Sequence, residues 1–217
     1  MEKGVSIVID GMTGVGKTSL VDILIKEFNF IPYKEIFRDE NNLLGKYHVE
    51  GKEWCFPMQL SFLNNRYNQY KEASLLDNTI MDRSIYSDPI FASLYHKIGH
   101  LKPEEYIVYK EVYDSLVNSL KTPKLVICLE VSPHEAIKRI KARGRSDELC
   151  VHDSYWEGLH KVYNDYYSNY SLAPLLRINV NDYDFVNNKQ DRNDILTLIK
   201  AWYKDNNLAD ANDMNLA

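Results

Sequence analysis

Short apolar runs alternate along the chain with longer segments of mixed polarity. Four runs lack the strict alternation that marks a half-exposed strand: Val5–Ile9, Thr79–Met81, Leu125–Leu129 and Leu176–Val180. A weaker fifth run covers Ile31–Phe37. Near-continuous apolar runs are typical of parallel strands that are buried on both faces. The pattern therefore predicts a five-stranded parallel sheet.

Between these runs, apolar residues recur at helical spacing. The expected helices are Ser19–Phe28, Pro57–Leu76, Glu104–Leu120, Pro133–Ala142 and Ser154–Tyr170. Ser132 before Pro133 is typical of a helix N-cap, and Asp153 or Ser154 is expected to cap the helix that follows. Strands that alternate with helices predict an α/β fold of three layers, with helices on both faces of the sheet.

The organisation of the chain favours one domain. A length of 217 residues is enough for one well-packed core and short for two. No internal repeat and no linker divides the sequence. We expect a single domain over residues 1–205 and a polar tail over residues 206–217.

Composition and charge exclude several classes of protein. Apolar residues make up 45% of the chain and charged residues 26%, which is typical of a globular protein. The formal net charge of −5 argues against binding to nucleic-acid polymers. The first apolar run is too short for a signal segment or a membrane span. Because Cys55, Cys128 and Cys150 show no metal-ligand spacing, we expect reduced thiols and a cytoplasmic location.

The segment after the first expected strand has the pattern GxxxxGKT and precedes an expected helix. Such a loop turns backbone N–H groups and a helix N-terminus toward the phosphates of a nucleotide. Lys17 would contact the β- and γ-phosphates of ATP, and Thr18 would bind Mg²⁺. The expected ATP-binding residues of this P-loop are Gly11, Met12, Thr13, Gly14, Val15, Gly16, Lys17, Thr18 and Ser19. The alternative is a chance glycine-rich turn, which would not require a strand before it and a helix after it.

Further polar clusters follow other strands. Glu35 lies at the end of the second run, and Asp82-Arg83 follows the third. Ligands of open α/β sheets bind beyond the carboxyl ends of the strands, so these residues and the P-loop are expected at one edge. A basic cluster at 138–145 stands out against the acidic background and indicates a small anionic ligand.

The motifs have the order and spacing of the deoxyribonucleoside kinase family, and the chain resembles its bacterial and viral members directed to purines and deoxycytidine. The resemblance covers about residues 5–160. It rests on the P-loop, FPMQLSFLNNR at 56–66, DRSIYSD at 82–88 and RIKARGRSDE at 139–148. It implies transfer of the γ-phosphoryl group of ATP–Mg²⁺ to the 5′-hydroxyl of a deoxyribonucleoside, for nucleotide salvage. A purine is the preferred base, and deoxycytidine stays open.

The resemblance implies three catalytic residues, Glu35, Asp82 and Arg83. Glu35 takes the proton of the 5′-hydroxyl, Arg83 orients Glu35 and the 5′-oxygen, and Asp82 holds Mg²⁺ together with Thr18. The opposite assignment, with Asp82 as the base, stays open. So do two structural interpretations: Glu35 as a surface glutamate, and Asp82-Arg83 as a helix cap with a salt bridge.

Other residues are implied around the acceptor. The Gln59 amide can donate to and accept from a base edge, and Arg66 and Asp88 are expected to pair beside the base. The family's tyrosine at the 3′-hydroxyl corresponds to Tyr47 or His48, with Tyr47 favoured. The structural alternative places Gln59 and Arg66 on an ordinary helix surface.

The basic cluster is expected to form a lid over about residues 139–150. Arg139, Arg143 and Arg145 would bind phosphate oxygens, because guanidinium groups pair with them at all working pH values. Glu148 would accept a hydrogen bond from the 3′-hydroxyl. A solvated basic helix end is the structural alternative.

Two other functions fit parts of the pattern. A nucleoside monophosphate kinase of the thymidylate kinase type shares the P-loop, the DR motif and the arginine lid, and Lys34 could clamp its acceptor phosphate. A non-catalytic nucleotide-binding scaffold subunit would share the fold without needing Lys17, the base and the lid arginines together. The resemblance also implies a homodimer through the helices at 57–76 and 88–100; core packing of their apolar side chains is the alternative.

Overall fold

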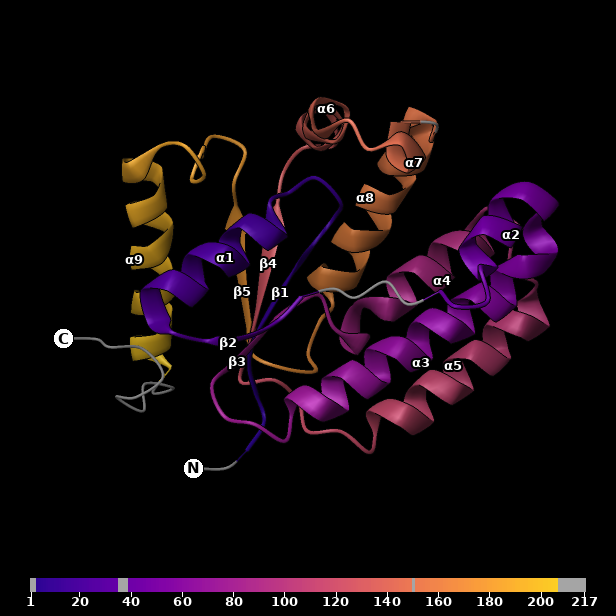
Figure 1. The fold of residues 1–217 in the computed structure, drawn as a ribbon, viewed down its shortest axis with the longest axis horizontal. Coiled ribbons are helices and arrows are strands. Elements are labelled where there is room, and N and C mark those ends of the chain that lie inside the picture. The colour runs from indigo at the N-terminus through magenta and orange to yellow at the C-terminus, as the bar shows by residue number, and fades with distance from the viewer. Residues whose placement is uncertain (1–2, 35–38, 150, 207–217) are drawn as a thin grey trace.

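The computed structural model describes residues 3–34, 39–149 and 151–206. These residues form a five-stranded parallel sheet of order β2-β3-β1-β4-β5 (Figure 1). The strands are β1 (Val5–Gly11), β2 (Ile31–Tyr33), β3 (Thr79–Asp82), β4 (Leu125–Glu130) and β5 (Leu175–Asn179). The chain order reverses at the central strand β1, and ligands of such sheets bind near that point. The predicted parallel sheet is confirmed.

Burial explains which strands the sequence shows most clearly. Every residue of β1 and β3 is buried, and β4 is buried up to its last residue. The edge strands β2 and β5 are partly exposed. A strand that is covered on both faces needs apolar residues at successive positions, whereas an edge strand does not. The weak signal of the run at 31–37 therefore reflects its position at the sheet edge.

Helices cover both faces of the sheet, as predicted (Figure 1). Helices α1 and α9 lie on one side, α3, α4, α5 and α8 lie on the other, and α6 and α7 lie beyond the carboxyl ends of the strands. Their bounds are α1 (Lys17–Phe28), α2 (Leu43–Glu50), α3 (Cys55–Ala73), α4 (Asp88–Lys97), α5 (Pro103–Val117), α6 (Pro133–Arg143), α7 (Ser146–Leu149), α8 (Asp153–Ser168) and α9 (Lys189–Asp205), with short 3₁₀ helices η1 (Lys52–Trp54) and η2 (Ile85–Ser87).

One predicted helix cap is confirmed and another is wrong. The Ser132 hydroxyl accepts a hydrogen bond from the backbone N–H of Glu135 at 3.2 Å, so Ser132 caps α6. Helix α8 was expected to be capped by Asp153 or Ser154, but both lie inside it. Its N-cap is His152, whose Nδ1 accepts from the Ser154 N–H at 3.2 Å. An imidazole nitrogen replaces the usual carboxylate or hydroxyl acceptor.

The helical pattern did not predict α2 or α9. Helix α2 has no fully buried residue, so it lacks a strong apolar stripe. Helix α9 buries Ile195, Leu196, Ile199 and Tyr203 and is polar elsewhere. Strand β2 ends at Tyr33, before the predicted end of its run. Residues 35–38 and the tail residues 207–217 lie outside the described residues.

Within the described ranges, no helix combines the length and apolar character needed to cross a lipid bilayer. Cys55 and Cys128 are buried, and neither belongs to a disulfide. Cys150 lies outside the described residues.

Candidate active site

The loop between β1 and α1 has the shape of a phosphate cradle. Gly11 has a φ of 133°, and a Cβ there would lie 2.4 Å from the carbonyl oxygen of Leu129. Gly16 has a φ of 99°, and a Cβ there would lie 2.8 Å from the Phe185 ring. Only glycine avoids both the strained backbone and these clashes. The GxxxxGKT pattern therefore marks positions where the loop passes close to β4 and to the segment after β5.

Lys17 begins α1, directly after the loop. Its Nζ donates to the carbonyl oxygens of Gly11 and Met12, at 3.0 and 3.1 Å. These bonds hold the lysine side chain over the loop, so that its ammonium group can contact phosphates bound there. The first N–H groups of α1 also face this point, because a helix N-terminus exposes unpaired donors.

Asp82 ends β3 beside the P-loop. Parallel pairing aligns Ile9 of β1 with Asp82, and the Thr18 hydroxyl donates to Asp82 Oδ2 at 2.5 Å. Within the described part of the chain, no hydrogen-bond partner is found for Asp82 Oδ1, although the side chain is only 4% exposed. A buried carboxylate oxygen without a partner, next to a hydroxyl, fits a hard cation such as Mg²⁺. Asp82 is not a helix cap.

Arg83 follows with an unusual backbone conformation. Its φ is +64°, in the left-handed region that non-glycine residues seldom occupy. Its N–H donates to the Ile9 carbonyl at 2.9 Å, so the first turn out of the strand is held to β1. Ser84 then caps η2 by accepting from the N–H of Tyr86. The side chain of Arg83 is buried, and its guanidinium lies 4.8 Å from the centre of the Phe91 ring.

The three lid arginines lie beside two carboxylates, those of Glu135 and Glu148. Arg139 donates through Nε to Glu135 at 2.9 Å and through a terminal nitrogen to the Val180 carbonyl at 3.0 Å. Arg143 donates to both oxygens of Glu148 at 2.6 Å. Arg145 lies 3.6 Å from the same carboxylate. The structure thus places Glu148 against the lid arginines.

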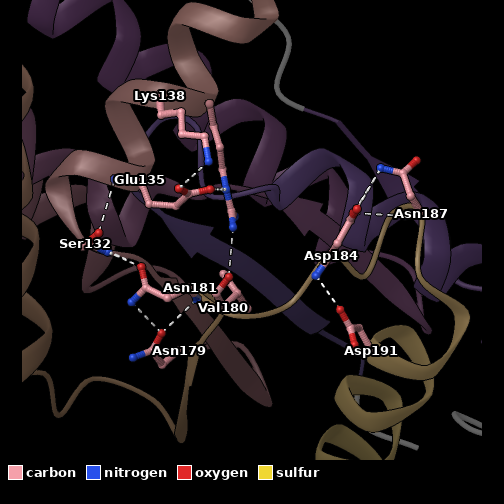
Figure 2. Close-up of polar contacts among 10 residues, drawn as sticks. Ser132, Glu135, Lys138, Asn179, Val180, Asn181, Asp184, Asn187 and Asp191 are labelled. Atoms are coloured by element: carbon pink, nitrogen blue, oxygen red, sulfur yellow. Dashed lines mark hydrogen bonds and ion pairs between the residues drawn. The ribbon is translucent and has the colours of Figure 1, made fainter.

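The segment after β5 holds the base of the lid helix, which the sequence did not predict. The Ser132 N–H donates to Asn181 Oδ1 at 2.8 Å, beside the bond between Arg139 and Val180 (Figure 2). In the same segment, the Asp184 N–H donates to Asp191 at 2.7 Å and so fixes the turn into α9. Helix α6 is therefore joined to β5 at the carboxyl edge of the sheet.

These groups surround one cavity of about 290 Å³. Its lining joins the P-loop, the DR motif and the lid, and the described residues that form it are Thr13, Gly14, Gly16, Lys17, Thr18, Ser19, Asp82, Arg83, Arg139, Arg143, Arg145 and Glu148. Four arginines and a lysine concentrate positive charge there, which is what a triphosphate requires. The lid arginines therefore line the same cavity as the P-loop and do not form only a solvated helix end.

A second polar group also contacts Phe91. Arg66 forms an ion pair with Asp88, whose side chain is 2% exposed. The Tyr109 hydroxyl donates to the other carboxylate oxygen at 3.4 Å. Burial, and then the Asp88 charge, raise the pKa of Tyr109 well above its usual value, so it remains a donor. The Arg66 guanidinium lies 5.9 Å from the centre of the Phe91 ring, so this ring contacts Arg66 and Arg83 alike.

The remaining predicted residues divide into three cases. Gln59 is 4% exposed, so it is not a helix-surface residue. Tyr47 packs against the core, whereas His48 is exposed. Glu35 lies outside the described residues. The sequence did not indicate Phe91 or Tyr109 as residues of the site. Only helical spacing from Asp88 could have indicated Phe91, and only a position on the apolar face of α5 could have indicated Tyr109.

A glycine loop that cradles phosphates, a buried carboxylate beside its threonine and arginines around the same cavity define a P-loop phosphotransferase. The sequence model of the deoxynucleoside kinase family matches residues 7–204. The chain belongs to this family, and it is an enzyme that phosphorylates deoxynucleosides with ATP. The predicted family, fold and reaction are confirmed. This assignment decides against a thymidylate kinase and against a non-catalytic scaffold.

Individual relatives agree. A deoxyguanosine kinase of Lactobacillus johnsonii is 34% identical over 208 residues and 92% of each chain. A deoxyadenosine/deoxycytidine kinase of Bacillus subtilis is 32% identical over 206 residues, 92% of this chain and 94% of the relative. The solved structure of a deoxyadenosine kinase from M. mycoides, with dCMP and a flexible dCDP bound as products, is similar with a TM-score of 0.79 and 32% identity, over 91% of this chain and 100% of that one.

Replacing Lys17 tests the phosphate cradle. Lys17→Ala should lower turnover by about 10²- to 10³-fold or more, because a charge that stabilises the transferred phosphoryl group is lost. The melting temperature should change little, because Lys17 contributes no apolar surface to the core. Lys26→Ala removes the same charge from the exposed end of the same helix and should leave turnover unchanged. Turnover near the wild-type rate in Lys17→Ala would contradict the site.

Proposed function

We propose that the preferred acceptor is a purine deoxynucleoside, with deoxycytidine as a second acceptor, and that the product 5′-monophosphate serves nucleotide salvage. The observation that carries this proposal is the ion pair of Arg66 with the buried Asp88, together with the burial of Gln59 on the same helix as Arg66. The names of the relatives support it, since they include deoxyguanosine, deoxyadenosine and deoxycytidine kinases.

The chemistry of this pair favours certain bases. Asp88 offers acceptor oxygens, which suit the exocyclic amino group of adenine or cytosine or the ring N–H of guanine. The Gln59 amide both donates and accepts, so it suits a base edge that carries both kinds of group. Thymine also has a ring N–H, but it has no exocyclic amino group and carries a methyl group beside its C4 carbonyl. Arg66 and Asp88 would crowd that methyl group, which disfavours thymidine.

The proposed reaction is an in-line transfer. The 5′-hydroxyl loses its proton to the Glu35 carboxylate while its oxygen attacks the γ-phosphorus of ATP. The bond from the γ-phosphorus to the β,γ-bridging oxygen breaks, and ADP leaves with that oxygen. Lys17 and the lid arginines stabilise the charge on the transferred group, and Arg83 orients the attacking oxygen. These roles follow from the family resemblance and from the lining of the cavity.

Thr18 and Asp82 are the proposed ligands of Mg²⁺. The contact between their oxygens and the unpartnered Asp82 Oδ1 support the assignment. When bound, the ion would neutralise charge on the β- and γ-phosphates of ATP.

The quaternary structure is a further part of the proposal. We propose a homodimer, as expected from the sequence, but with α5 in place of the helix at 88–100. Helix α4 packs against α3, α5 and α8, so it is covered within one chain. Helix α5 instead exposes Ile107, Val108 and Val112 beside α3. The proposal also includes one catalytic domain over residues 1–205 and a cytoplasmic location, supported by the absence of a disulfide at Cys55 and Cys128.

Two carboxylate variants separate the proposed base from the proposed metal ligand. Glu35→Gln should lower kcat by about 10²- to 10⁴-fold and leave the Mg²⁺ dependence unchanged, because only the base is lost. Asp82→Asn should raise the Mg²⁺ concentration at half-maximal activity by about 10- to 100-fold. Steady-state rates over a Mg²⁺ titration check both. If Asp82→Asn keeps the Mg²⁺ response and flattens the pH–rate profile, Asp82 is the base.

A charge on α5 tests the dimer. Val108→Glu should convert a dimer to a monomer, because Val108 is 44% exposed on the proposed contact face and the new charge would be buried there. Light scattering after size-exclusion chromatography gives the mass. Leu198→Glu is the matched control, since Leu198 is 47% exposed on α9, on the far side of the sheet (Figure 1). A monomeric wild type would overturn the dimer proposal.

Substitutions of the buried pair test base selection. Asp88→Ala alone should cripple the enzyme, because an unpaired buried arginine costs about 3–5 kcal/mol. Arg66→Met with Asp88→Ala removes both charges and opens apolar space, so thymidine phosphorylation should appear while purine phosphorylation falls. Values of kcat/KM for deoxyadenosine, deoxyguanosine, deoxycytidine and thymidine, in the wild type and in the double variant, measure the change. A wild type that already prefers thymidine would refute the proposed preference.

A further inference from the structure

The end of α4 holds one histidine in a fixed place. Gly99 has a φ of +74°, its N–H donates to the His96 carbonyl at 3.1 Å, and the next N–H, from His100, donates to the Tyr95 carbonyl at 2.8 Å. This is the Schellman pattern that ends many helices, with glycine in the left-handed position. It turns the chain back, so that the imidazole of His100 lies over the last turns of α4.

His100 is in contact with Tyr47 from a different part of the chain. The Tyr47 hydroxyl lies 2.7 Å from His100 Nδ1. The His100 ring stacks on Tyr95 with a centroid distance of 6.3 Å and an angle of 18°. Tyr47 meets the same Tyr95 ring edge-on, at 5.4 Å. Since α2 has no fully buried residue, Tyr47 joins this otherwise loosely packed helix to α4.

Further tyrosines lie beside Tyr47. The centre of the Tyr95 ring lies 5.4 Å from that of Tyr47 and 6.5 Å from that of Tyr155. Burial raises the pKa of all three tyrosines, so each keeps its proton. Arg83, which lines the phosphate cavity, lies close enough to Tyr155 for its charge to lower the pKa of that hydroxyl. Packed aromatic rings thus extend from His100 through Tyr95 to Tyr155.

His100 determines which way the proton of the Tyr47 hydroxyl points. A tyrosine hydroxyl has one proton to donate and two lone pairs that accept. When Nδ1 of neutral His100 accepts the proton of Tyr47, that tyrosine has no proton left for a ligand, but its oxygen can still accept. A ligand hydroxyl that approaches Tyr47 must then act as a donor. A ligand with hydrogen in place of that hydroxyl offers nothing to the oxygen.

We propose that His100 is a positioning residue, which fixes the Tyr47 hydroxyl so that its oxygen accepts a hydrogen bond from the 3′-hydroxyl of the acceptor sugar. His100 thereby makes the enzyme selective for nucleosides that carry a 3′-hydroxyl. The inference rests on the proposed function and on the family resemblance, which implies that Tyr47 faces the 3′-hydroxyl of the deoxyribose.

The experiment compares the best deoxynucleoside substrate with its 2′,3′-dideoxy analogue. His100→Phe keeps an aromatic ring on Tyr95 but has no acceptor nitrogen, and His100→Leu is a second variant without one. Both should reduce the ratio of kcat/KM for the two nucleosides by about three- to tenfold, the effect of one hydrogen bond. His100→Asn places an acceptor oxygen near the position of Nδ1 and should keep most of the ratio. Melting temperatures confirm that each variant is folded.

Tyr47→Phe separates failure of this inference from failure of the proposed role of Tyr47. We expect Tyr47→Phe to lower the ratio, and the double variant Tyr47→Phe/His100→Phe to match it, because His100 acts through Tyr47. An unchanged ratio in Tyr47→Phe would refute the role of Tyr47 and the inference with it. A reduced ratio in Tyr47→Phe, with both His100 variants unchanged or equally impaired on both nucleosides, would overturn the inference alone.

Discussion

The active site depends on the parallel pairing of β1 with β3. Ile9 lies opposite Asp82 in this pairing, so the first residue out of each strand emerges at the same edge. Thr18 and Asp82 are far apart in the sequence. Their oxygens are in contact because the parallel pairing of β1 and β3 brings the ends of both strands together. A shift of one residue would turn every side chain of β3 to the opposite face. The strand register therefore fixes the reacting centre before any ligand binds.

A single aromatic ring organises the rest of the cleft. The Phe91 ring contacts the guanidinium of Arg83, which lines the cavity with the P-loop, and that of Arg66, which pairs with Asp88. Both cations rest against its π-system, which offers attraction without hydrogen bonds. The unusual backbone of Arg83 is the cost of this arrangement, about 1–3 kcal/mol at such a position.

Sequence patterns predicted the features that local chemistry determines. The continuous apolar composition of β1, β3 and β4 predicted the sheet, and GxxxxGKT predicted the phosphate loop. The pairing of Arg66 with Asp88 came from a resemblance, and it is observed. The cap at His152 and the contact of His100 with Tyr47 were not predicted, because they depend on the folded geometry and not on spacing. Spacing alone left the choice between Tyr47 and His48 open. In helix α2, Tyr47 is partly buried and His48 is exposed to solvent.

The pairing of Glu148 with Arg143 and Arg145 has a consequence for how the two substrates influence one another. The guanidinium groups that would bind phosphates are already occupied by an internal carboxylate. If the phosphates of a triphosphate bind these guanidinium groups, they displace the Glu148 carboxylate. Glu148 can then accept a hydrogen bond from another hydroxyl or amide. If the acceptor supplies that group, each substrate tightens the binding of the other by the same factor, since coupling between two ligands is reciprocal. An internal carboxylate would then link the occupancy of the donor site to that of the acceptor site.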